Sequence, residues 1–177
     1  MKYNFGITGY TGVLGSEFIK YNSSRKFIKF RGDITKKKDI NEWLRKKNIN
    51  YLFHFAAVVP TNIVKSNFDY ANKVNFIGTK YLVDECLKSK KIKWFFFAST
   101  SHVYGFSRGK IKETKKTRPI SKYGQTKLRA ENYIVRSFKG KKLTYCIGRI
   151  FSFTHKKQSG DFVIPSIIKR IKKKIYT

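Results

Sequence analysis

The stretch Thr8-Gly9-Tyr10-Thr11-Gly12-Val13-Leu14-Gly15 decides the fold of this chain of 177 residues. It follows a short apolar run that predicts a strand, and it opens an amphipathic run that predicts a helix. Glycines at this spacing between a strand and a helix are typical of a dinucleotide-binding turn. Gly9 permits the tight turn, Gly12 lets the backbone approach a pyrophosphate, and Gly15 permits close packing of helix on strand. At this glycine content, chance would produce about 0.05 such spacings.

Strand and helix patterns alternate along the rest of the chain. Apolar runs predict strands over Lys2–Thr8, Phe27–Phe30, Tyr51–Phe55, Lys93–Ala98 and Leu143–Ile147. Helical spacing of apolar residues predicts helices over Gly12–Tyr21, near Ile40–Leu44, and over Phe68–Leu87, Tyr123–Phe138 and Val163–Lys174. Such alternation indicates βαβ units. The predicted fold class is α/β, a Rossmann-type doubly wound parallel sheet with helices on both faces, in one domain over residues 1–177.

Composition places the chain among globular, cytoplasmic proteins. Hydrophobic residues make up 41% of it, and no apolar run reaches the roughly 18 residues of a transmembrane helix. The N-terminus lacks the apolar stretch and cleavage site of a signal peptide. Cys86 and Cys146 lie in apolar runs and are predicted to be buried, reduced thiols. The three histidines and two cysteines show no metal-ligand spacing, so no metal site is predicted.

The formal net charge of +30 admits two interpretations. Lysine pairs are spread along predicted loops and helix ends, which indicates a solvated basic surface without one designed patch. The alternative is a functional basic surface that attracts nucleic acid or anionic membranes. No helix-turn-helix, zinc or RNA-binding signature accompanies the charge, so no specific nucleic-acid partner is predicted. For the last helix, burial against the sheet or a further domain is expected over membrane contact.

A candidate catalytic pair lies at Tyr123 and Lys127. On a helix these positions share one face, and an ammonium beside a phenol is expected to lower the tyrosine pKa from about 10. Such a tyrosine can exchange a proton with a carbinol or carbonyl oxygen. In so lysine-rich a chain, chance produces roughly two Tyr-x-x-x-Lys pairs. The pair therefore depends for its support on its surroundings, above all on the cluster Ser99-Thr100-Ser101.

The end of the second predicted strand bears on the choice of cofactor. Its sequence is Phe30-Arg31-Gly32-Asp33-Ile34. An acidic residue near this point usually binds the ribose 2′-OH of NAD, whereas an arginine accommodates the 2′-phosphate of NADP. Arg31 indicates NADP if it faces the cofactor, and it is a surface residue otherwise. The sequence leaves NAD and NADP open.

Taken together, these segments resemble the extended branch of the short-chain dehydrogenase/reductase superfamily, and within it the NAD-dependent epimerases and dehydratases. Nucleotide-sugar epimerases and 4-keto-sugar reductases are the nearest types. The resemblance covers residues 2 to about 174. It is carried by the glycine turn and by the segments Gly32-Asp33-Ile34-Thr35, His54-Phe55-Ala56-Ala57, Asn75 to Thr79, Ser99 to Gly105, Tyr123 to Lys127, and Arg149-Ile150-Phe151-Ser152.

The resemblance implies a role for each matching residue. Tyr123 would be the general acid/base, Lys127 would lower its pKa and bind the nicotinamide ribose, and Thr100 would hydrogen-bond the reacting oxygen. NAD or NADP would be the cofactor, and a nucleotide sugar would be the substrate, in pathways that supply cell-surface polysaccharide. A homodimer is compatible with the resemblance. The implied cofactor-binding residues are Gly9, Thr11, Gly12, Val13, Leu14, Gly15, Arg31, Asp33, Ile34, Ala56, Ala57, Tyr123, Lys127 and Phe151.

Three departures from the family pattern narrow the expectation. Ser101 and His102 stand where dehydratases of the family carry acidic residues, which disfavours dehydration. The stretch from Gly15 to Asp33 holds one predicted strand where many relatives have two. The C-terminal substrate-binding region of the family appears absent from these 177 residues. The prediction is an NAD(P)-dependent epimerase or keto-reductase; the alternative is a non-catalytic NAD(P)-binding module or truncated remnant without a substrate region.

Overall fold

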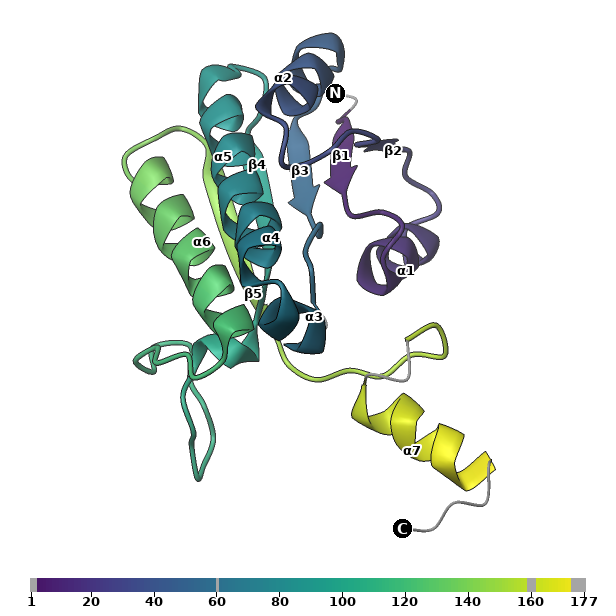
Figure 1. The fold of residues 1–177 in the computed structure, drawn as a ribbon. Coiled ribbons are helices and arrows are strands. Elements are labelled where there is room, and N and C mark those ends of the chain that lie inside the picture. Colours follow the sequence, from purple (N-terminus) through teal and green to yellow (C-terminus); the bar gives the residue numbers. More distant parts are fainter. Residues whose placement is uncertain (1–2, 60, 159–161, 173–177) are drawn as a thin grey trace.

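Five parallel strands form the centre of the structure, which is a computed structural model that describes residues 3–59, 61–158 and 162–172. The strands are β1 (Phe5–Thr8), β2 (Phe27–Lys29), β3 (Tyr51–His54), β4 (Trp94–Thr100) and β5 (Thr144–Ile150). Their order in the sheet is β2-β1-β3-β4-β5 (Figure 1). The order reverses direction between β1 and β3, and open α/β sheets bind ligands at such a switch point. The predicted strand count between Gly15 and Asp33 is confirmed.

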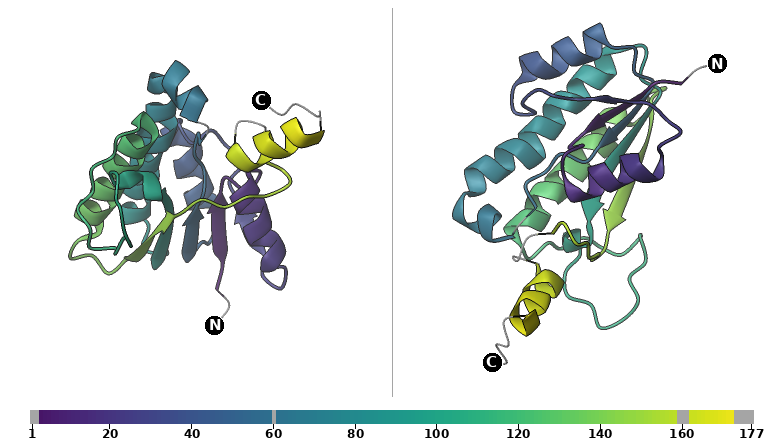
Figure 2. Two further views of the ribbon diagram at one scale, coloured as in Figure 1. Left: turned by 90° about the horizontal axis from the view of Figure 1, so that it is seen from below. Right: turned by 90° about the vertical axis from the view of Figure 1, so that its right-hand side faces the viewer.

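Helices cover the two faces of the sheet unequally (Figure 2). The helices α2 (Lys37–Lys46), α5 (Thr79–Lys88) and α6 (Lys122–Phe138) pack side by side on one face, with the short α4 (Phe68–Asn72) leading into α5. On the opposite face α1 (Val13–Tyr21) covers the strands through Phe18, whose ring lies 4.7 Å from that of Phe53. The predicted doubly wound parallel sheet with helices on both faces is confirmed.

The larger core lies between the sheet and α2, α5 and α6. Its fully buried side chains come from alternate positions of the strands and from one stripe of each helix, as expected for parallel strands beneath helices. They include Ile40, Leu52, Leu82, Phe95, Phe97 and Ile134. This packing sets the carboxyl ends of β1, β3 and β4 at one edge of the sheet.

The long helix predicted over Phe68–Leu87 is interrupted at its centre. Residues Lys73–Gly78 form a π-helix, a form that occurs mostly as short bulges at functional sites. The bulge places the buried Asn75 side chain on the loop after β3, where Asn75 Oδ1 accepts from the N–H of Val58 at 2.7 Å and Asn75 Nδ2 donates to the carbonyl of Val58 at 2.9 Å. The prediction of one continuous helix was therefore wrong in detail, because the hydrogen bonds of the Asn75 side chain outweighed regular α-helical backbone bonding.

One expectation about burial is wrong, and one of the two alternatives for the last helix, burial against the sheet, is not found among the described residues. Cys86 is buried, but Cys146 is exposed, because it lies on the face of β5 that α1 does not reach. The last helix, α7 (Val163–Lys172), has no buried residue among those described and extends away from the sheet (Figure 1). Residues 173–174 of the predicted helix lie outside the described part.

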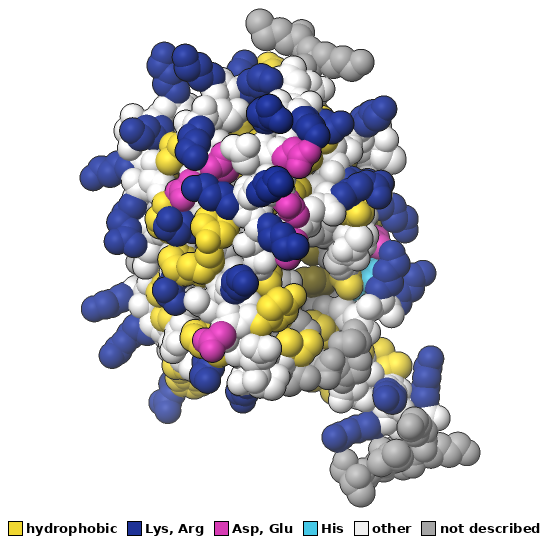
Figure 3. Space-filling model, turned by 45° about the horizontal axis from the view of Figure 1, so that its top comes forward, with side chains coloured by type: hydrophobic (Ala, Val, Ile, Leu, Met, Phe, Trp, Pro, Cys, Tyr) yellow, Lys and Arg dark blue, Asp and Glu magenta, His cyan; other side chains and the backbone are white. Residues whose placement is uncertain are grey.

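Basic side chains are distributed over the surface. On the face shown in Figure 3, Lys and Arg lie over most of the molecule, with a few Asp and Glu between them. On this face they form a general basic surface and not one patch. Within the described part of the chain, none of the helices combines the length and the apolar character that crossing a bilayer requires.

The buried His54 joins β1 to α5 beneath the site. Its Nδ1 lies 2.6 Å from Thr8 Oγ1 and its Nε2 lies 2.8 Å from Thr79 Oγ1. Desolvation, together with the nearby Lys127 ammonium, lowers the pKa of His54 from 6.5 to about 3. The ring is therefore neutral near pH 7, and its two hydrogen bonds give it a structural role.

We expect acid to destabilise the protein through His54. The unfolded chain protonates this residue near pH 6.5, whereas the folded protein does so only near pH 3. The contribution of His54 to the free energy of unfolding is therefore fully present above pH 6.5 and decreases as the pH is lowered from 6.5 to 3. The slope from this group is about 1.4 kcal/mol per pH unit. Urea denaturation at several pH values should give a shallower slope for His54→Gln but not for a His102→Gln control, which is exposed. Equal slopes for His54→Gln and the unmutated protein would contradict the assignment.

Candidate functional site

The glycine turn between β1 and α1 contains two kinds of glycine. Gly9 has φ +67°, a conformation that favours glycine, and a Cβ at Gly15 would lie 2.3 Å from the Gly9 carbonyl oxygen. Both are required by the fold. Gly12 is different, since its φ is −69° and an added Cβ would have its nearest atom at 3.4 Å, an ordinary contact. Neither the backbone nor the packing of the protein requires a glycine at position 12.

Open N–H groups lie directly beyond Gly12. It is the N-cap of α1 and has no side chain to cap the first-turn N–H groups at Val13 and Leu14. Such a helix end, with its positive dipole, suits a phosphate. The space that a Cβ of Gly12 would occupy is therefore free for an anion, and the residues present fit the pyrophosphate of a dinucleotide.

A cavity of about 350 Å³ lies beside this turn at the carboxyl ends of β1, β2 and β3. Six of the predicted cofactor residues line it: Gly9, Thr11, Arg31, Asp33, Ile34 and Ala56. The chain thus brings together residues that are up to 47 positions apart, at the switch point of the sheet. Ala57 follows directly in the loop that Asn75 holds, and the exposed Phe151 follows β5 at the same edge.

Thr100 at the end of β4 lies against Tyr123 of α6, and Lys127 follows one turn later on that helix, with its ammonium over Phe97 of β4. All three are buried, with 5%, 8% and 1% of their surface exposed. Thr100 forms a side-chain hydrogen bond with Tyr123, and Ser121 caps α6 by accepting from the N–H of Gly124 at 3.0 Å. The cap and the strand end therefore set the phenol against the threonine hydroxyl. The His102 ring packs edge-on against Tyr123 at 5.7 Å.

Burial shifts the pKa values of the pair in directions that the sequence did not predict. Desolvation raises the pKa of Tyr123 to about 12, against the lowering effect of the Thr100 hydrogen bond. Desolvation also lowers the pKa of Lys127 to about 7, and the charge of Glu131 opposes this shift. The Lys127 Nζ lies 4.0 Å from the centre of the Phe97 ring. The predicted lowering of the Tyr123 pKa is wrong for this structure, because the loss of water outweighs the hydrogen bond with Thr100.

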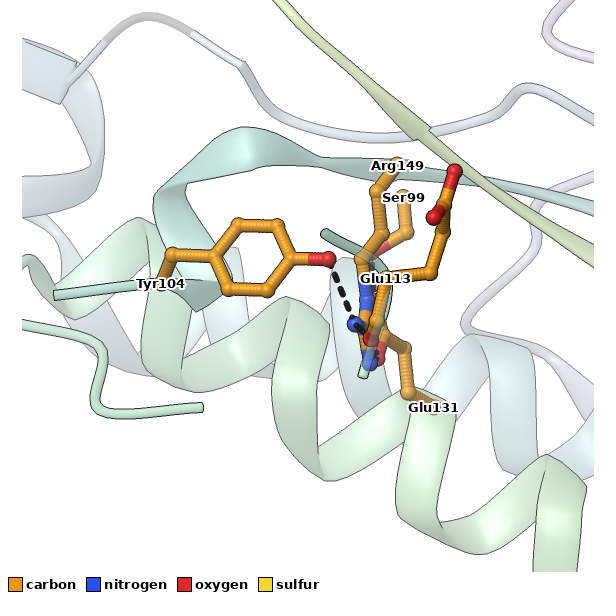
Figure 4. A network of polar contacts seen from close by, with 5 residues as sticks. All are labelled: Ser99, Tyr104, Glu113, Glu131 and Arg149. Atoms are coloured by element: carbon orange, nitrogen blue, oxygen red, sulfur yellow. Dashed lines mark hydrogen bonds and ion pairs between the residues drawn. The ribbon is translucent and has the colours of Figure 1, made fainter. Parts of the chain in front are cut away.

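A buried carboxylate, Glu131, connects α6 to the strands β4 and β5 (Figure 4). It is 2% exposed and lies one helical turn after Lys127. Arg149 of β5 donates to it through Nε at 3.1 Å and Nη2 at 2.8 Å, and Ser99 of β4 donates to its Oε1. The Nη1 of Arg149 also donates to the Tyr104 hydroxyl at 2.8 Å. These bonds raise the pKa of Arg149 and tie α6 to β4 and β5.

Sequence reasoning missed Glu131 as a site residue. A signal was present, because Tyr123, Lys127 and Glu131 follow one another at intervals of four on one helix face. Sequence reasoning named Arg149 as a site residue only through the family resemblance. The contacts of both follow from the pairing of β4 with β5, in which Ser99 lies opposite Arg149.

The arrangement offers two functions at one edge of the sheet. The glycine turn and cavity can bind a phosphorylated nucleotide, and the Thr100–Tyr123–Lys127 group can hold or transfer a proton. Within the described residues, no group of three or more His, Cys, Asp or Glu side chains is placed to hold a metal ion.

Comparison with known proteins gives matches along most of the chain. A family model described as GDP-mannose 4,6 dehydratase matches residues 17–175, which begin just after the glycine turn. A protein of Bacillus subtilis (strain 168) described as an uncharacterized UDP-glucose epimerase, YtcB, is 29% identical over 126 residues. The match covers 70% of this chain and 39% of that protein.

Solved structures share the fold. MoeE5 in complex with UDP-glucose and NAD is 27% identical, with a TM-score of 0.83 over 94% of this chain and 60% of that one. A dTDP-4-dehydrorhamnose reductase of Bacillus anthracis str. Ames in complex with NADP has a TM-score of 0.81 at 21% identity, over 98% of this chain and 61% of that one. The chain therefore spans about 40 to 60% of the length of these proteins.

We expect the buried ion pair of Arg149 and Glu131 to be a major support of the site. Arg149→Ala leaves the carboxylate buried without its cation, which should cost about 3–5 kcal/mol of unfolding free energy. Adding Glu131→Gln to that variant removes the uncompensated charge and should recover a large part of the loss. Urea denaturation of the two single variants and the double variant measures this coupling. Additive losses in the double variant would contradict it.

Proposed function

Since the chain belongs to the family whose model is described as GDP-mannose 4,6 dehydratase, we propose that the whole protein is an NAD(P)-dependent enzyme that epimerises or reduces a nucleotide-activated sugar. Gly12 is the observation that carries the cofactor part of this proposal. The fold itself does not require a glycine at this position, which lies at a helix N-terminus beside a cavity. The approach of a bound phosphate is a reason for a glycine there. The proposed substrate class, a nucleotide-activated sugar, rests on membership of the family.

The proposed roles follow from the contacts of each residue. The N–H groups at Val13 and Leu14 bind the pyrophosphate, and Arg31, Asp33, Ile34 and Ala56 line the space for the adenosine half. Ala57 and Phe151 lie toward the nicotinamide end. The nicotinamide, when bound, accepts or supplies a hydride. Tyr123 holds the proton that leaves or reaches the sugar oxygen, and Thr100 orients the phenol.

Lys127 has an electrostatic role in this proposal. Its low pKa of about 7 shows how costly its burial is, and Glu131 is the carboxylate that favours its charged form. In the charged form Lys127 can bind ribose hydroxyls and oppose the raised pKa of Tyr123. Dehydration is the less favoured reaction, since Ser101 and His102 follow Thr100 where an acid would be needed.

A second candidate is a dinucleotide-binding module without catalysis. The Tyr123 pKa of about 12 favours it, because a phenol held so firmly protonated is a poor base near neutral pH. Turnover assays separate the two candidates.

We expect Gly12→Asp to abolish binding of NAD(P)H without unfolding the protein. The added side chain has room in the protein itself, and its carboxylate takes the place of a phosphate oxygen. Fluorescence titration should show saturable binding for the unmutated protein and at least about a hundredfold weaker binding for the variant. Gly109→Asp is the matched control, since a side chain there meets nothing within 4 Å. Unimpaired binding by Gly12→Asp would refute the site.

We expect Tyr123→Phe to lower kcat by about 10²–10⁴-fold in the whole protein, because it removes the proton that the reaction transfers. The affinity for NAD(P)H should stay within about twofold of the original. Turnover of UDP- and dTDP-sugars is the measurement. Tyr133→Phe removes a hydroxyl from the same helix, one that donates to Asp84, and serves as the control. Unchanged turnover for Tyr123→Phe would remove this tyrosine from the mechanism.

A further inference from the structure

Two cations lie over one aromatic ring at the rim of the nucleotide cavity. The Lys29 Nζ is 5.5 Å from the centre of the Tyr10 ring, and the guanidinium carbon of Arg31 is 5.9 Å from the same point. Lys29 ends β2 and Arg31 comes two residues later, so both side chains leave the strand on the same side. Contacts of this kind hold a cation over the ring face. They place two positive charges around the Tyr10 ring, which follows Gly9 of the glycine turn.

No carboxylate of the described residues forms an ion pair with either cation. Among residues 3–59, 61–158 and 162–172, neither Lys29 nor Arg31 takes part in an ion pair. The Oδ1 of Asp33 instead accepts from the N–H and the hydroxyl of Thr35, each at 2.8 Å. The Oδ2 of Asp39 accepts from the N–H of Asp33 at 2.9 Å. The nearby carboxylates of Asp33 and Asp39 thus accept from backbone N–H groups and a hydroxyl of the same segment, and the two cations are left for an external anion.

The position of the pair identifies the anion. With the pyrophosphate at the glycine turn, the adenosine ribose lies near the end of the second strand, where an acidic residue takes a 2′-OH and an arginine takes a 2′-phosphate. Phe30-Arg31-Gly32 occupies this point, and the acid that follows it, Asp33, is engaged with Thr35 through its Oδ1. Phe30 is buried, whereas Arg31 is exposed and lines the cavity. Of these three residues, Arg31 is the one with a charge to offer the ribose.

We propose that Arg31 and Lys29, held over Tyr10, bind the 2′-phosphate of the adenosine ribose and make the protein selective for NADP(H) over NAD(H). The inference rests on the proposed function, since it requires a dinucleotide at the glycine turn. The planar guanidinium can donate two parallel hydrogen bonds to the phosphate, and the lysine adds a point charge. NAD, which lacks this phosphate, leaves the two cations unpaired.

Titration with NADPH and NADH tests the selectivity. We expect NADPH to bind at least about tenfold more tightly, the worth of one charge-assisted hydrogen bond. Arg31→Ala should weaken NADPH binding by about tenfold or more and change NADH binding by less than about twofold. Lys29→Ala should act in the same direction with a smaller effect, because its head is not planar.

Arg25→Ala is the matched control. Arg25 lies at the opposite end of β2, exposed, with its guanidinium carbon 5.0 Å from the centre of the Phe5 ring. The substitution removes the same charge and the same kind of contact away from the cavity, so NADPH binding should stay unchanged. In a protein of charge +30, this control separates a specific site from general attraction.

Competition with small nucleotides is a second, independent test of whether the protein recognises the 2′-phosphate. Both 2′,5′-ADP and 3′,5′-ADP carry the same groups and charge, but only the first has its phosphate on the 2′-oxygen. We expect 2′,5′-ADP to displace NADPH at least about tenfold more effectively. Equal displacement by both would overturn the proposal and indicate a general basic surface.

The outcomes distinguish this proposal from the proposed function. Equal or tighter binding of NADH, with Arg31→Ala unchanged, would overturn the 2′-phosphate site and leave the dinucleotide site standing. Absence of saturable binding by either NADPH or NADH would overturn both. Preference for NADPH that disappears in Arg31→Ala and persists in Arg25→Ala supports the site.

Discussion

The buried carboxylate of Glu131 holds together the elements that carry the candidate catalytic residues. It accepts from Ser99 of β4 and from the fork of Arg149 of β5, and it stands one turn beyond Lys127 on α6. A buried charge is tolerated only when it is paired and hydrogen-bonded. The same carboxylate favours the ammonium form of Lys127, whose pKa burial lowers to about 7. Structural support and electrostatic tuning of the candidate site therefore depend on one side chain.

At the glycine turn, the opposite half of the site offers backbone N–H groups and free space instead of charged side chains. Gly9 and Gly15 let β1, α1 and the loop after β3 approach closely, and Gly12 leaves free space at the helix end. The cations that meet this half, Lys29 and Arg31, come from the end of β2. A dinucleotide bound here would place its charged end among backbone N–H groups and cations, and its other end toward the buried Tyr123. This division suits a cofactor that is anionic at one end and reactive at the other.

The sequence predicted best where a local rule is strict. The glycine spacing, the alternation of strands and helices, and the single strand between Gly15 and Asp33 were all confirmed by the structure, and the family resemblance was confirmed by comparison. It failed where burial decides the outcome. Cys146 is exposed, because α1 does not reach its side of β5. The pKa of Tyr123 rises to about 12, because an i, i+4 spacing says nothing about loss of water.

By itself, the amino-acid sequence determined the α/β class, through the alternation of strand and helix patterns, and the position of the glycine turn, through the spacing within one segment. It also singled out the candidate pair Tyr123 and Lys127, through the family resemblance of the segments around it. Only the tertiary structure decided which distant residues meet: Asn75 with Val58, Glu131 with Arg149, and Lys29 and Arg31 with Tyr10. Such contacts depend on strand order and on the π-helical bulge. They require the packing of several elements at once, and no local pattern encodes that packing.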